Sequence, residues 1–404
     1  MTGGADVVVI GGGINGASTA FHLATRGAGH VVLLDTPSPR SATAKSGAMV
    51  TVHHASLPES LLAHQGLLEL GRVPELTGGE TGLTRTGIVH LLPARFTAAM
   101  RDNVAAQRSA GIPVRELDPT ELRQLWPGGD FADVGAAVIE PSGGYADPLL
   151  TTRAYLDGAR RAGAEIQRAS ARRLLVAKGR VRGVETDSGA VIGASAVVLA
   201  AGVWSAGLLA ALGLDLGLTT RRVQVAAFRT EPGAFQGGPV LLDQVRGSWF
   251  RPDTRTSVLA GLEWALPVDG PGDGPEGVDQ WYVELCRQHL AGRFAGLRGA
   301  PMRGGWAGLV AMGPGSRPVV DHLTEATGLY CVVGDSGSSF KTAPIVGKRL
   351  AEWIVDGAPA GPELAPLARS LTSRPAPGDG YGNFASAAAL SRQIHRMRRT
   401  TAPA

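Results

Sequence analysis

The alternation of apolar and polar positions predicts a strand, a turn and a helix near the N-terminus. Residues 6–10 form a short, β-branched apolar run, which is typical of a strand buried on both faces. Apolar residues then recur at helical spacing, with Ala17 and Phe21 on one face, and Gly27 is placed to end the helix. A second apolar run at 31–35 predicts the next strand. This order is that of a βαβ unit in a parallel sheet.

Three glycines separate the first strand from the helix at the spacing of the dinucleotide-binding fingerprint. Gly11 allows the tight turn, Gly13 lets the backbone approach a pyrophosphate, and Gly16 lets the helix pack on the strand. The start of the helix presents free N–H groups to an anion. Asp35 ends the second run, where a carboxylate binds the ribose hydroxyls and disfavours a 2′-phosphate. The segment therefore predicts a site for a dinucleotide without a 2′-phosphate, which excludes NADP. The alternative is a glycine turn that binds no ligand.

Two later patterns extend this prediction. Residues 179–192 indicate a β-meander, and the strand that follows ends in a turn of small residues at 200–202, which can pass close to a dinucleotide. Near the C-terminus, a strand leads into a glycine- and serine-rich loop at 334–341 and then into a helix over about 343–355. The N–H groups of such a loop can bind an anion or the polar edge of a ring.

Composition and charge narrow the class of protein. With 404 residues, 44% hydrophobic and 18% charged, the sequence is that of an ordinary globular chain. Four arginines after Phe384 account for the whole net charge of +4, because the other 35 basic residues balance the 35 acidic ones. These arginines are Arg392, Arg396, Arg398 and Arg399. We therefore expect no nucleic-acid partner. Two cysteines give neither a disulfide framework nor a metal site, so we expect a cytoplasmic protein without a bound metal. Since the early apolar run is too short for a signal or a span, no membrane association is expected.

Several motifs in a fixed order resemble one family. They are the N-terminal fingerprint with Asp35, "SGAMV" at 46–50, "LDPTELRQLWP" at 117–127, "GGYADP" at 143–148, "VVLAAGVWS" at 197–205, "WFRP" at 249–252, "WAGL" at 306–309 and "GDSGSSFK" at 334–341. Over residues 5–360 the chain resembles the flavin-dependent amine and amino-acid oxidoreductases of the D-amino-acid oxidase superfamily. It is most similar there to the sarcosine oxidase and glycine oxidase branch.

The resemblance implies an α/β architecture in which a Rossmann-type FAD-binding domain is interleaved with a smaller, mixed-sheet α+β substrate domain. The FAD-binding domain would comprise 1–82, 145–218 and 318–362, and the substrate domain 83–144 and 219–317. The strand-like segments 81–92, 221–230 and 257–266 agree with this division. Residues 363–404, rich in proline and alanine and then basic, are predicted to be a partly ordered tail.

The same resemblance names FAD as the cofactor and assigns residues to it. The first motif would hold the ADP part, "SGAMV" would run beside the flavin, and the C-terminal loop would close over the pyrimidine edge. The implied contacts are Gly11, Gly13, Ile14, Asn15, Gly16, Asp35, Ser46, Gly47, Ala48, Met49, Ala201, Gly202, Trp204, Gly334, Gly337, Ser338, Ser339, Phe340 and Lys341.

Three charged residues are implied as catalytic. Lys341 stands where sarcosine oxidase-like enzymes carry a lysine that meets the substrate carboxylate; the alternative is a solvated lysine at a helix start. Arg251 is expected to face the site, where a guanidinium suits a carboxylate, or else to form a surface ion pair. Glu263 replaces an active-site histidine of sarcosine oxidase and would bind an ammonium or accept a proton; the alternative is a surface glutamate.

Three further side chains are predicted to line the substrate pocket. Trp249 and Trp264 would supply apolar walls, unless they are ordinary core residues, and His53 would face the flavin, unless it is structural.

The chain also departs from the family pattern. Leu259 occupies the position of the lysine that promotes reaction of reduced flavin with oxygen, and Val50 that of an arginine that grips the substrate carboxylate. Neither the region of Gly308 nor residues 41–45 offer the cysteine or histidine that anchors flavin covalently in some relatives. The departures predict non-covalent FAD, inefficient oxidase activity and a substrate larger or less anionic than sarcosine.

The predicted function is FAD-dependent oxidation of a C–N bond of an amine or amino acid to an imine, by hydride transfer to the flavin. Oxygen or another acceptor would then take the electrons, and the protein would be a monomer or homodimer. The alternatives are a 2-hydroxy-acid or polyol dehydrogenase of the same superfamily, an aromatic hydroxylase, and a flavin-binding electron-transfer subunit. The "GGYADP" and "VVLAAGVWS" segments argue against the hydroxylase.

Overall fold

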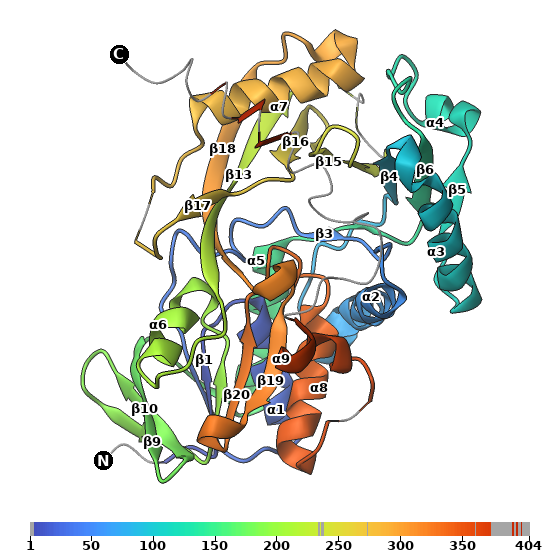
Figure 1. Ribbon diagram of the computed structural model, residues 1–404. Coiled ribbons are helices and arrows are strands. Elements are labelled where there is room, and N and C mark those ends of the chain that lie inside the picture. Colours follow the sequence, from blue (N-terminus) through green and yellow to red (C-terminus); the bar gives the residue numbers. More distant parts are fainter. Residues whose placement is uncertain are drawn as a thin grey trace.

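The computed structural model describes residues 4–232, 235, 238–272, 274–359, 361–372, 390, 391, 393, 394 and 397. The four arginines to which the net charge was traced lie outside the described residues. Two sheets organise the molecule, and Figure 1 shows them at opposite ends, with the N-terminus near the lower one. In the described residues, no helix combines the length and the apolar character needed to span a bilayer.

The lower sheet is built around the first strand of the chain. Its six strands run in the order β19 (Val319–Leu323), β20 (Leu329–Val333), β12 (Ala196–Leu199), β1 (Val7–Ile10), β2 (Val31–Leu34) and β8 (Glu165–Gln167). All neighbours are parallel except β19 and β20. Since β2 lies on one side of β1 and β12 on the other, the strand order reverses at β1, and the carboxyl ends meeting there form the usual ligand site of such sheets.

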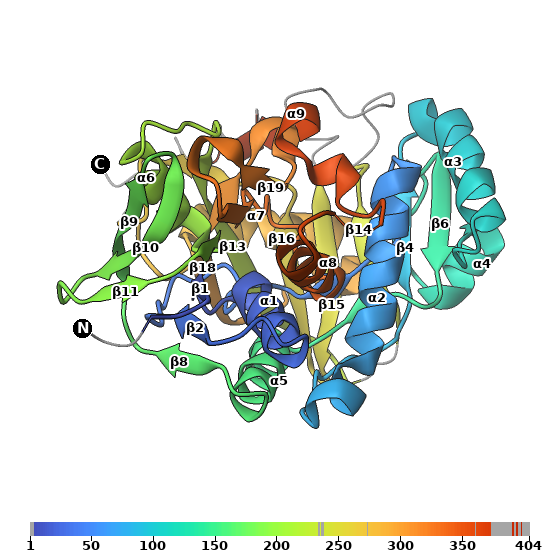
Figure 2. The same cartoon turned by 90° about the horizontal axis from the view of Figure 1, so that it is seen from below.

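The two faces of this sheet have different covers, because successive side chains of a strand point to opposite faces. Val7 and Val9 pack with a layer of helices, whereas Val8 and Ile10 pack with a β-meander. The helices are α1 (Ile14–Thr25), α2 (Leu57–Thr77), α5 (Pro148–Arg161) and α8 (Ala343–Asp356), of which α1 lies between α5 and α8 (Figure 2). The meander consists of β9 (Ala171–Ala177), β10 (Arg180–Thr186) and β11 (Val191–Gly193), as the sequence predicted.

The upper sheet has nine strands of mixed direction. Its path is β17 (Leu266–Val268), β13 (Thr219–Arg229), β16 (Ser257–Leu262), β15 (Ser248–Thr254), β14 (Val240–Asp243), β4 (Ile88–Leu92), β6 (Ala136–Glu140) and β5 (Arg115–Leu117), and β18 (Met302–Met312) pairs with β13. Helix α7 (Gln280–Arg293) crosses it at the top of Figure 1, while α3 (Thr97–Ser109) and α4 (Pro119–Leu125) flank its far edge. Leu390 and Ile394, from the predicted tail, are buried in the same core as α7.

The remaining elements connect these layers. They are the two-stranded pair β3 (Met49–Val50) and β7 (Gly144–Tyr145), the helices α6 (Ser205–Ala210) and α9 (Arg369–Thr372), and six short 3₁₀ turns at 94–96, 202–204, 295–297, 314–316, 324–326 and 365–367. Asp147 caps the start of helix α5, because its carboxylate accepts from the N–H groups of Leu149 and Leu150. The fold class predicted from the sequence is confirmed; the domain boundaries stay a prediction.

Candidate active site

A cavity of about 640 Å³ opens at the carboxyl end of β1, where the strand order reverses. Its lining includes the glycine turn, the end of β2 and the turn after β12. Of the residues assigned to the cofactor, this adenosine-side cavity is lined by Gly11, Gly13, Ile14, Asn15, Asp35, Ala201, Gly202, Trp204 and Gly334. Exposed Trp204 and Leu149 also line it, so two apolar side chains are available to cover a planar ring.

The glycine turn leaves no room for a side chain at Gly11 and Gly16, two of the three positions that the fingerprint reserves for glycine. Gly11 has φ of +103°, and a Cβ there would press against the Ala200 backbone. A Cβ on Gly16 would overlap the Gly11 carbonyl oxygen. Gly16 therefore acts through packing and does not itself line the cavity. Asp35 Oδ1 accepts from the Gly12 N–H at 2.8 Å, which fixes the turn against the end of β2.

The start of α1 is suited to an anion. Gly13 precedes the helix and offers no capping side chain. Among the described residues, the one side-chain partner of an N–H at this helix start is Thr43 Oγ1, 3.2 Å from the Ile14 nitrogen. In the described chain, the buried Asn15 Oδ1 has no hydrogen-bond partner although it belongs to a residue of the cavity wall. An uncapped helix start and an unpaired polar atom in one cavity fit a dinucleotide that brings a diphosphate and hydroxyl donors.

A second cavity of about 210 Å³ continues from the first, with Ile14, Ala42, Thr43 and Asp335 in the walls of both. This flavin-side cavity is lined by the other assigned cofactor residues, Ser46, Gly47, Ala48, Met49, Gly337, Ser338, Ser339, Phe340 and Lys341. It lies between the two sheets, because β13, the end of β16 and Trp249 of β15 also line it. Together the cavities form one continuous site for an elongated molecule.

Lys341 is a buried cation in this second cavity. Only 5% of the residue is exposed, so the alternative of a solvated lysine is wrong. Its ammonium donates to the Ser338 carbonyl oxygen at 3.1 Å, and within the described part of the chain no carboxylate forms an ion pair with it. Burial lowers the pKa of Lys341 to about 8, against the attraction of Glu140 and Glu59. A buried ammonium with spare N–H groups can bind an anion brought in by a ligand.

Arg251 does not line either cavity, so the expectation that it faces the site is corrected. Its Nη1 donates to the Gly47 carbonyl oxygen at 2.7 Å, its Nη2 lies 3.4 Å from Asp253, and the guanidinium stacks on Tyr145 at 4.5 Å. Burial lowers its pKa. The guanidinium is held behind the cavity wall, because its acceptor is the carbonyl oxygen of Gly47, a residue that lines the flavin-side cavity. Arg251 therefore acts on the site through Gly47.

His53 also lies outside the cavity walls, which corrects its assignment to the substrate pocket. It is 3% exposed, its Nδ1 donates to Gln107 Oε1 at 2.8 Å, and its ring meets His90 edge to face at 4.9 Å. Burial lowers its pKa to about 3, so the imidazole is neutral near pH 7. Thr51, two residues earlier, lines the cavity, but β3 ends at Val50, and the His53 ring is instead held by Gln107.

Glu263, Trp249 and Trp264 all line the flavin-side cavity. The indole of Trp249 lies against Gly261, where a Cβ would overlap it, and reaches Gly47. Trp264 packs edge to face on Trp281 with ring centroids 6.0 Å apart. The Glu263 carboxylate, the Lys341 ammonium and two indole rings thus line the same small cavity.

The two apolar residues that depart from the expected family pattern lie outside the walls of this cavity. Leu259 is buried in an apolar cluster with Val225 and Trp249, and Val50 is fully buried in the helical core. Neither lines the cavity. At Gly308, an added Cβ would press against the side chain of Lys45. A cysteine therefore does not fit at Gly308 without displacing Lys45.

Sequence reasoning missed several wall residues. Thr43 caps the Ile14 N–H across 29 positions, and Gln224 exchanges two hydrogen bonds with Asp279 across 55 positions. Asp335, in the motif at 334–341, lies at the junction of the cavities, and burial raises its pKa to about 6. Only Asp335 had a local signal, a carboxylate inside a loop already assigned to the cofactor.

Comparison with known proteins identifies the family. The profile of the family described as DAO, FAD dependent oxidoreductase, matches residues 6–353. The chain belongs to this family. The FAD-dependent oxidoreductase predicted from the sequence is thereby confirmed, with FAD as the cofactor.

Relatives and solved structures agree with this assignment. The chain is 27% identical over 368 residues to the 4-methylaminobutanoate oxidase (formaldehyde-forming) of Paenarthrobacter nicotinovorans; the match covers 87% of this chain but 44% of that oxidase. The structure of L-proline dehydrogenase from P. horikoshii has a TM-score of 0.81 at 22% identity, covering 90% of this chain and 96% of that one. The structure of iminodiacetate oxidase from Chelativorans sp. BNC1 has a TM-score of 0.75 at 26% identity, covering 90% of this chain and 98% of that one. The chain spans less than half the length of the 4-methylaminobutanoate oxidase, so the activity of that oxidase is not assigned to this chain.

Proposed function

We propose that this protein binds FAD non-covalently across the two cavities and oxidises the C–N bond of an amine or amino acid that carries a single carboxylate and is larger than sarcosine. The single observation that carries the substrate class is Lys341, a buried ammonium without a carboxylate partner in the described chain, in the wall of the flavin-side cavity. The names of two relatives support an amine rather than a hydroxy acid as the substrate. One is an oxidase of a methylamino acid and the other is an oxidase of iminodiacetate.

The proposed cofactor contacts follow from the walls. The uncapped start of α1 would hold the diphosphate, Asp35 the ribose, and the loops at 46–49 and 337–341 the flavin ring. When bound, FAD supplies the acceptor for the two electrons and the hydrogen that leave the substrate. No covalent link is proposed, because Lys45 occupies the space beside Gly308.

The protein's own tasks in this reaction are positioning and charge. Lys341 binds the substrate carboxylate, the indole rings of Trp249 and Trp264 exclude water from the reacting carbon, and Glu263 faces the amine, where a carboxylate attracts an ammonium or receives its proton. Lys341 is the buried cation of this cavity and suits a substrate with one carboxylate, since neither Val50 nor Leu259 supplies a further cation at the family's positions.

The electron acceptor and the setting are also proposals. Without a lysine at the position of Leu259, we propose that an acceptor other than oxygen takes the electrons efficiently. Both cysteines are buried and unpaired, which supports a reducing cytoplasm. A monomer or homodimer is proposed.

An anaerobic substrate screen tests the proposal. The holoprotein is mixed with amines, amino acids and matched 2-hydroxy acids, and the loss of flavin absorbance is followed. Bleaching by an N-substituted amino acid, with no bleaching by its hydroxy-acid counterpart, is expected. Bleaching by hydroxy acids alone would replace the proposal with the hydroxy-acid dehydrogenase, and no bleaching by any compound would favour the electron-transfer subunit.

A further inference from the structure

The hydrogen-bond ladder along β13 is interrupted at one place beside the flavin-side cavity. Strand β13 pairs with β16 as far as Ala226 and Ala260, and it pairs with β17 from Arg222 and Leu266. Between these two pairs, three residues of β13 face the five residues 261–265. The bulged segment 261–265 is therefore longer than a regular ladder allows, and it must leave the plane of the sheet.

The bulged segment forms part of the cavity wall. Leu262, Glu263, Trp264 and Ala265 all line the flavin-side cavity. The Glu263 N–H donates to the Gly247 carbonyl oxygen at 2.8 Å, and not to β13. Bulges next to a site re-aim side chains. The bulge thus accounts for the place of Glu263 and Trp264, to which the proposed function assigns the amine and the exclusion of water.

A tyrosine hydroxyl occupies the interruption in the ladder. If the ladder continued from Ala226 and Ala260, the partner of Leu262 would be Gln224. Instead, the Tyr282 hydroxyl lies between them: it donates to the Gln224 carbonyl oxygen at 2.5 Å and accepts from the Leu262 N–H at 2.9 Å. Both contacts are buried, where an unpaired backbone group is costly. One hydroxyl thus replaces the ladder hydrogen bond at the point where the bulge begins.

Helix α7 holds this hydroxyl in place. Tyr282 belongs to the first turn of α7, which packs on β13 and β16 (Figure 1). Asp279, just before the helix, accepts from Arg222 Nη1 at 2.9 Å and from Gln224 Nε2 at 3.0 Å. Its N–H donates to Gln224 Oε1 at 2.7 Å. Since the Arg222 side chain is itself buried, the start of α7 is tied to β13 by a charge-assisted network.

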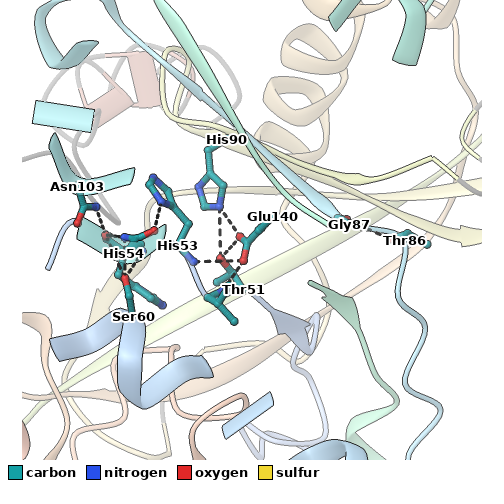
Figure 3. A network of polar contacts seen from close by, with 11 residues as sticks. Thr51, His53, His54, Ser60, Thr86, Gly87, His90, Asn103 and Glu140 are labelled. Atoms are coloured by element: carbon teal, nitrogen blue, oxygen red, sulfur yellow. Dashed lines mark hydrogen bonds and ion pairs between the residues drawn. The ribbon is translucent and has the colours of Figure 1, made fainter. Parts of the chain in front are cut away.

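Another part of the cavity wall is held separately. Figure 3 shows Thr51, which lines the same cavity, beside Glu140 and His90. Its hydroxyl donates to the Glu140 carboxylate and lies 3.3 Å from His90 Nε2. These partners come from β6 and β4, and β16, β15 and β14 lie between them and β13 in the sheet. The polar cluster of Figure 3 therefore holds Thr51, whereas the Tyr282 hydroxyl holds the bulged segment.

We propose that Tyr282 is a positioning residue of the active site, whose hydroxyl keeps the ladder open and thereby holds Glu263 and Trp264 toward the substrate. The inference rests on the proposed function, because it assigns Tyr282 a task through Glu263. No described residue of α7 lines either cavity, so the helix acts on substrate binding only through the bulged segment.

Removal of the hydroxyl tests this role. Tyr282→Phe keeps the ring but leaves the buried Gln224 carbonyl and Leu262 N–H without their shared partner. The bulged segment should move, and the KM for the amine found in the screen should rise about tenfold. The Kd for FAD should not change, because the adenosine-side cavity lies in the lower sheet. Tyr155→Phe removes the hydroxyl of another fully buried tyrosine, in α5, and as the matched control should leave KM unchanged.

A double-mutant cycle shows whether the effect passes through Glu263. Glu263→Gln should raise KM severalfold in the unchanged protein but hardly further in Tyr282→Phe, because the carboxylate there no longer faces the amine. Equal fold-changes in the two backgrounds would overturn the inference and leave the proposed function standing. If Glu263→Gln leaves KM unaltered in the unchanged protein, the role of Glu263 in the proposed function fails, and the task assigned to Tyr282 fails with it.

Hydrogen exchange of the unchanged holoprotein covers the case in which Tyr282→Phe does not fold. Because the Leu262 N–H donates to a buried hydroxyl, its amide should exchange as slowly as that of Ala260, which lies in the regular ladder. Exchange resolved to single amides measures this. Rapid exchange at Leu262 beside slow exchange at Ala260 would overturn the proposal, since the hydroxyl would then not hold the bulged segment.

Discussion

The adenosine-side and flavin-side cavities are parts of one site, yet they are built by different means. The first is made mainly of backbone: a glycine turn, an uncapped helix start and a small-residue turn, all within the lower sheet. The second is made of side chains from both sheets, with a buried ammonium and a carboxylate of raised pKa. From this difference we expect that cofactor affinity depends mainly on space in the first cavity, and that substrate choice depends mainly on charge in the second.

The largest expected effect breaks the backbone half of this comparison. In Gly16→Ala the added Cβ overlaps the Gly11 carbonyl oxygen, so α1 must move away from β1. Overpacking of this kind costs about 3 kcal/mol, which weakens FAD binding about a hundredfold. Titration of the apoprotein with FAD measures this loss. Gly296→Ala, where nothing lies within 4 Å of the added atom, is the control, and equal affinities in the two variants would refute the role of packing.

A smaller loss is expected when the turn loses its carboxylate. Asp35→Ala removes the acceptor of the Gly12 N–H and the proposed ribose contact. The loss of a charge-assisted hydrogen bond, about 1.5–3 kcal/mol, should raise the Kd for FAD about tenfold or more. Asp35→Asn keeps an acceptor for the Gly12 N–H, so its Kd for FAD should lie between that of the unchanged protein and that of Asp35→Ala. If Asn and Ala variants bind FAD as well as the unchanged protein, the ribose assignment is wrong.

Thr43→Val sharpens the comparison at the junction of the cavities. The substitution keeps the shape but leaves the Ile14 N–H without its hydroxyl partner. One neutral hydrogen bond is worth about 1 kcal/mol, so the Kd for FAD should rise about fivefold, with the substrate KM unchanged. Isothermal titration and steady-state kinetics check the two values. A change in KM with FAD affinity intact would place Thr43 in substrate binding instead.

The smallest expected effect concerns stability and pH. Burial raises the pKa of Asp335 from 3.8 to about 6, so the folded state holds this proton more tightly than the unfolded chain does. Its contribution to stability is therefore complete below pH 4 and is lost as pH rises to about 6. The Asp335→Asn side chain cannot lose a proton. The Tm of this variant, relative to that of the unchanged protein, should therefore rise by a few degrees as pH increases from about 4 to about 6. Thermal unfolding between pH 4 and 7 measures this, and parallel Tm curves would contradict it.

The sequence predicted the two cavities unequally, for a physical reason. A glycine turn and an acid at the end of the next strand are local, so spacing alone located Gly11, Gly13, Gly16 and Asp35. The flavin side depends on contacts between distant segments, such as Glu140 with Thr51 across 89 positions. There, family resemblance located Lys341 and Glu263 but misplaced Arg251 and His53.

The two misplaced residues share one cause. Resemblance assigns a residue to a strand, but it does not say what the end of a long side chain contacts. Arg251 found the Gly47 carbonyl and the Tyr145 ring, and His53 found Gln107. All three partners lie in segments other than that of the side chain they contact, and no periodicity within 249–252 or 46–54 encodes these contacts.

Flavin reduction by a matched pair of substrates tests the central claim most directly. Anaerobic reduction is followed with an N-substituted amino acid found in the screen and with the corresponding amine that lacks the carboxylate, in the unchanged protein and in Lys341→Met. We expect the unchanged protein to favour the amino acid, and Lys341→Met to raise its KM at least tenfold while leaving that of the plain amine unaltered. An unchanged preference in Lys341→Met would show that the buried ammonium does not bind the substrate carboxylate.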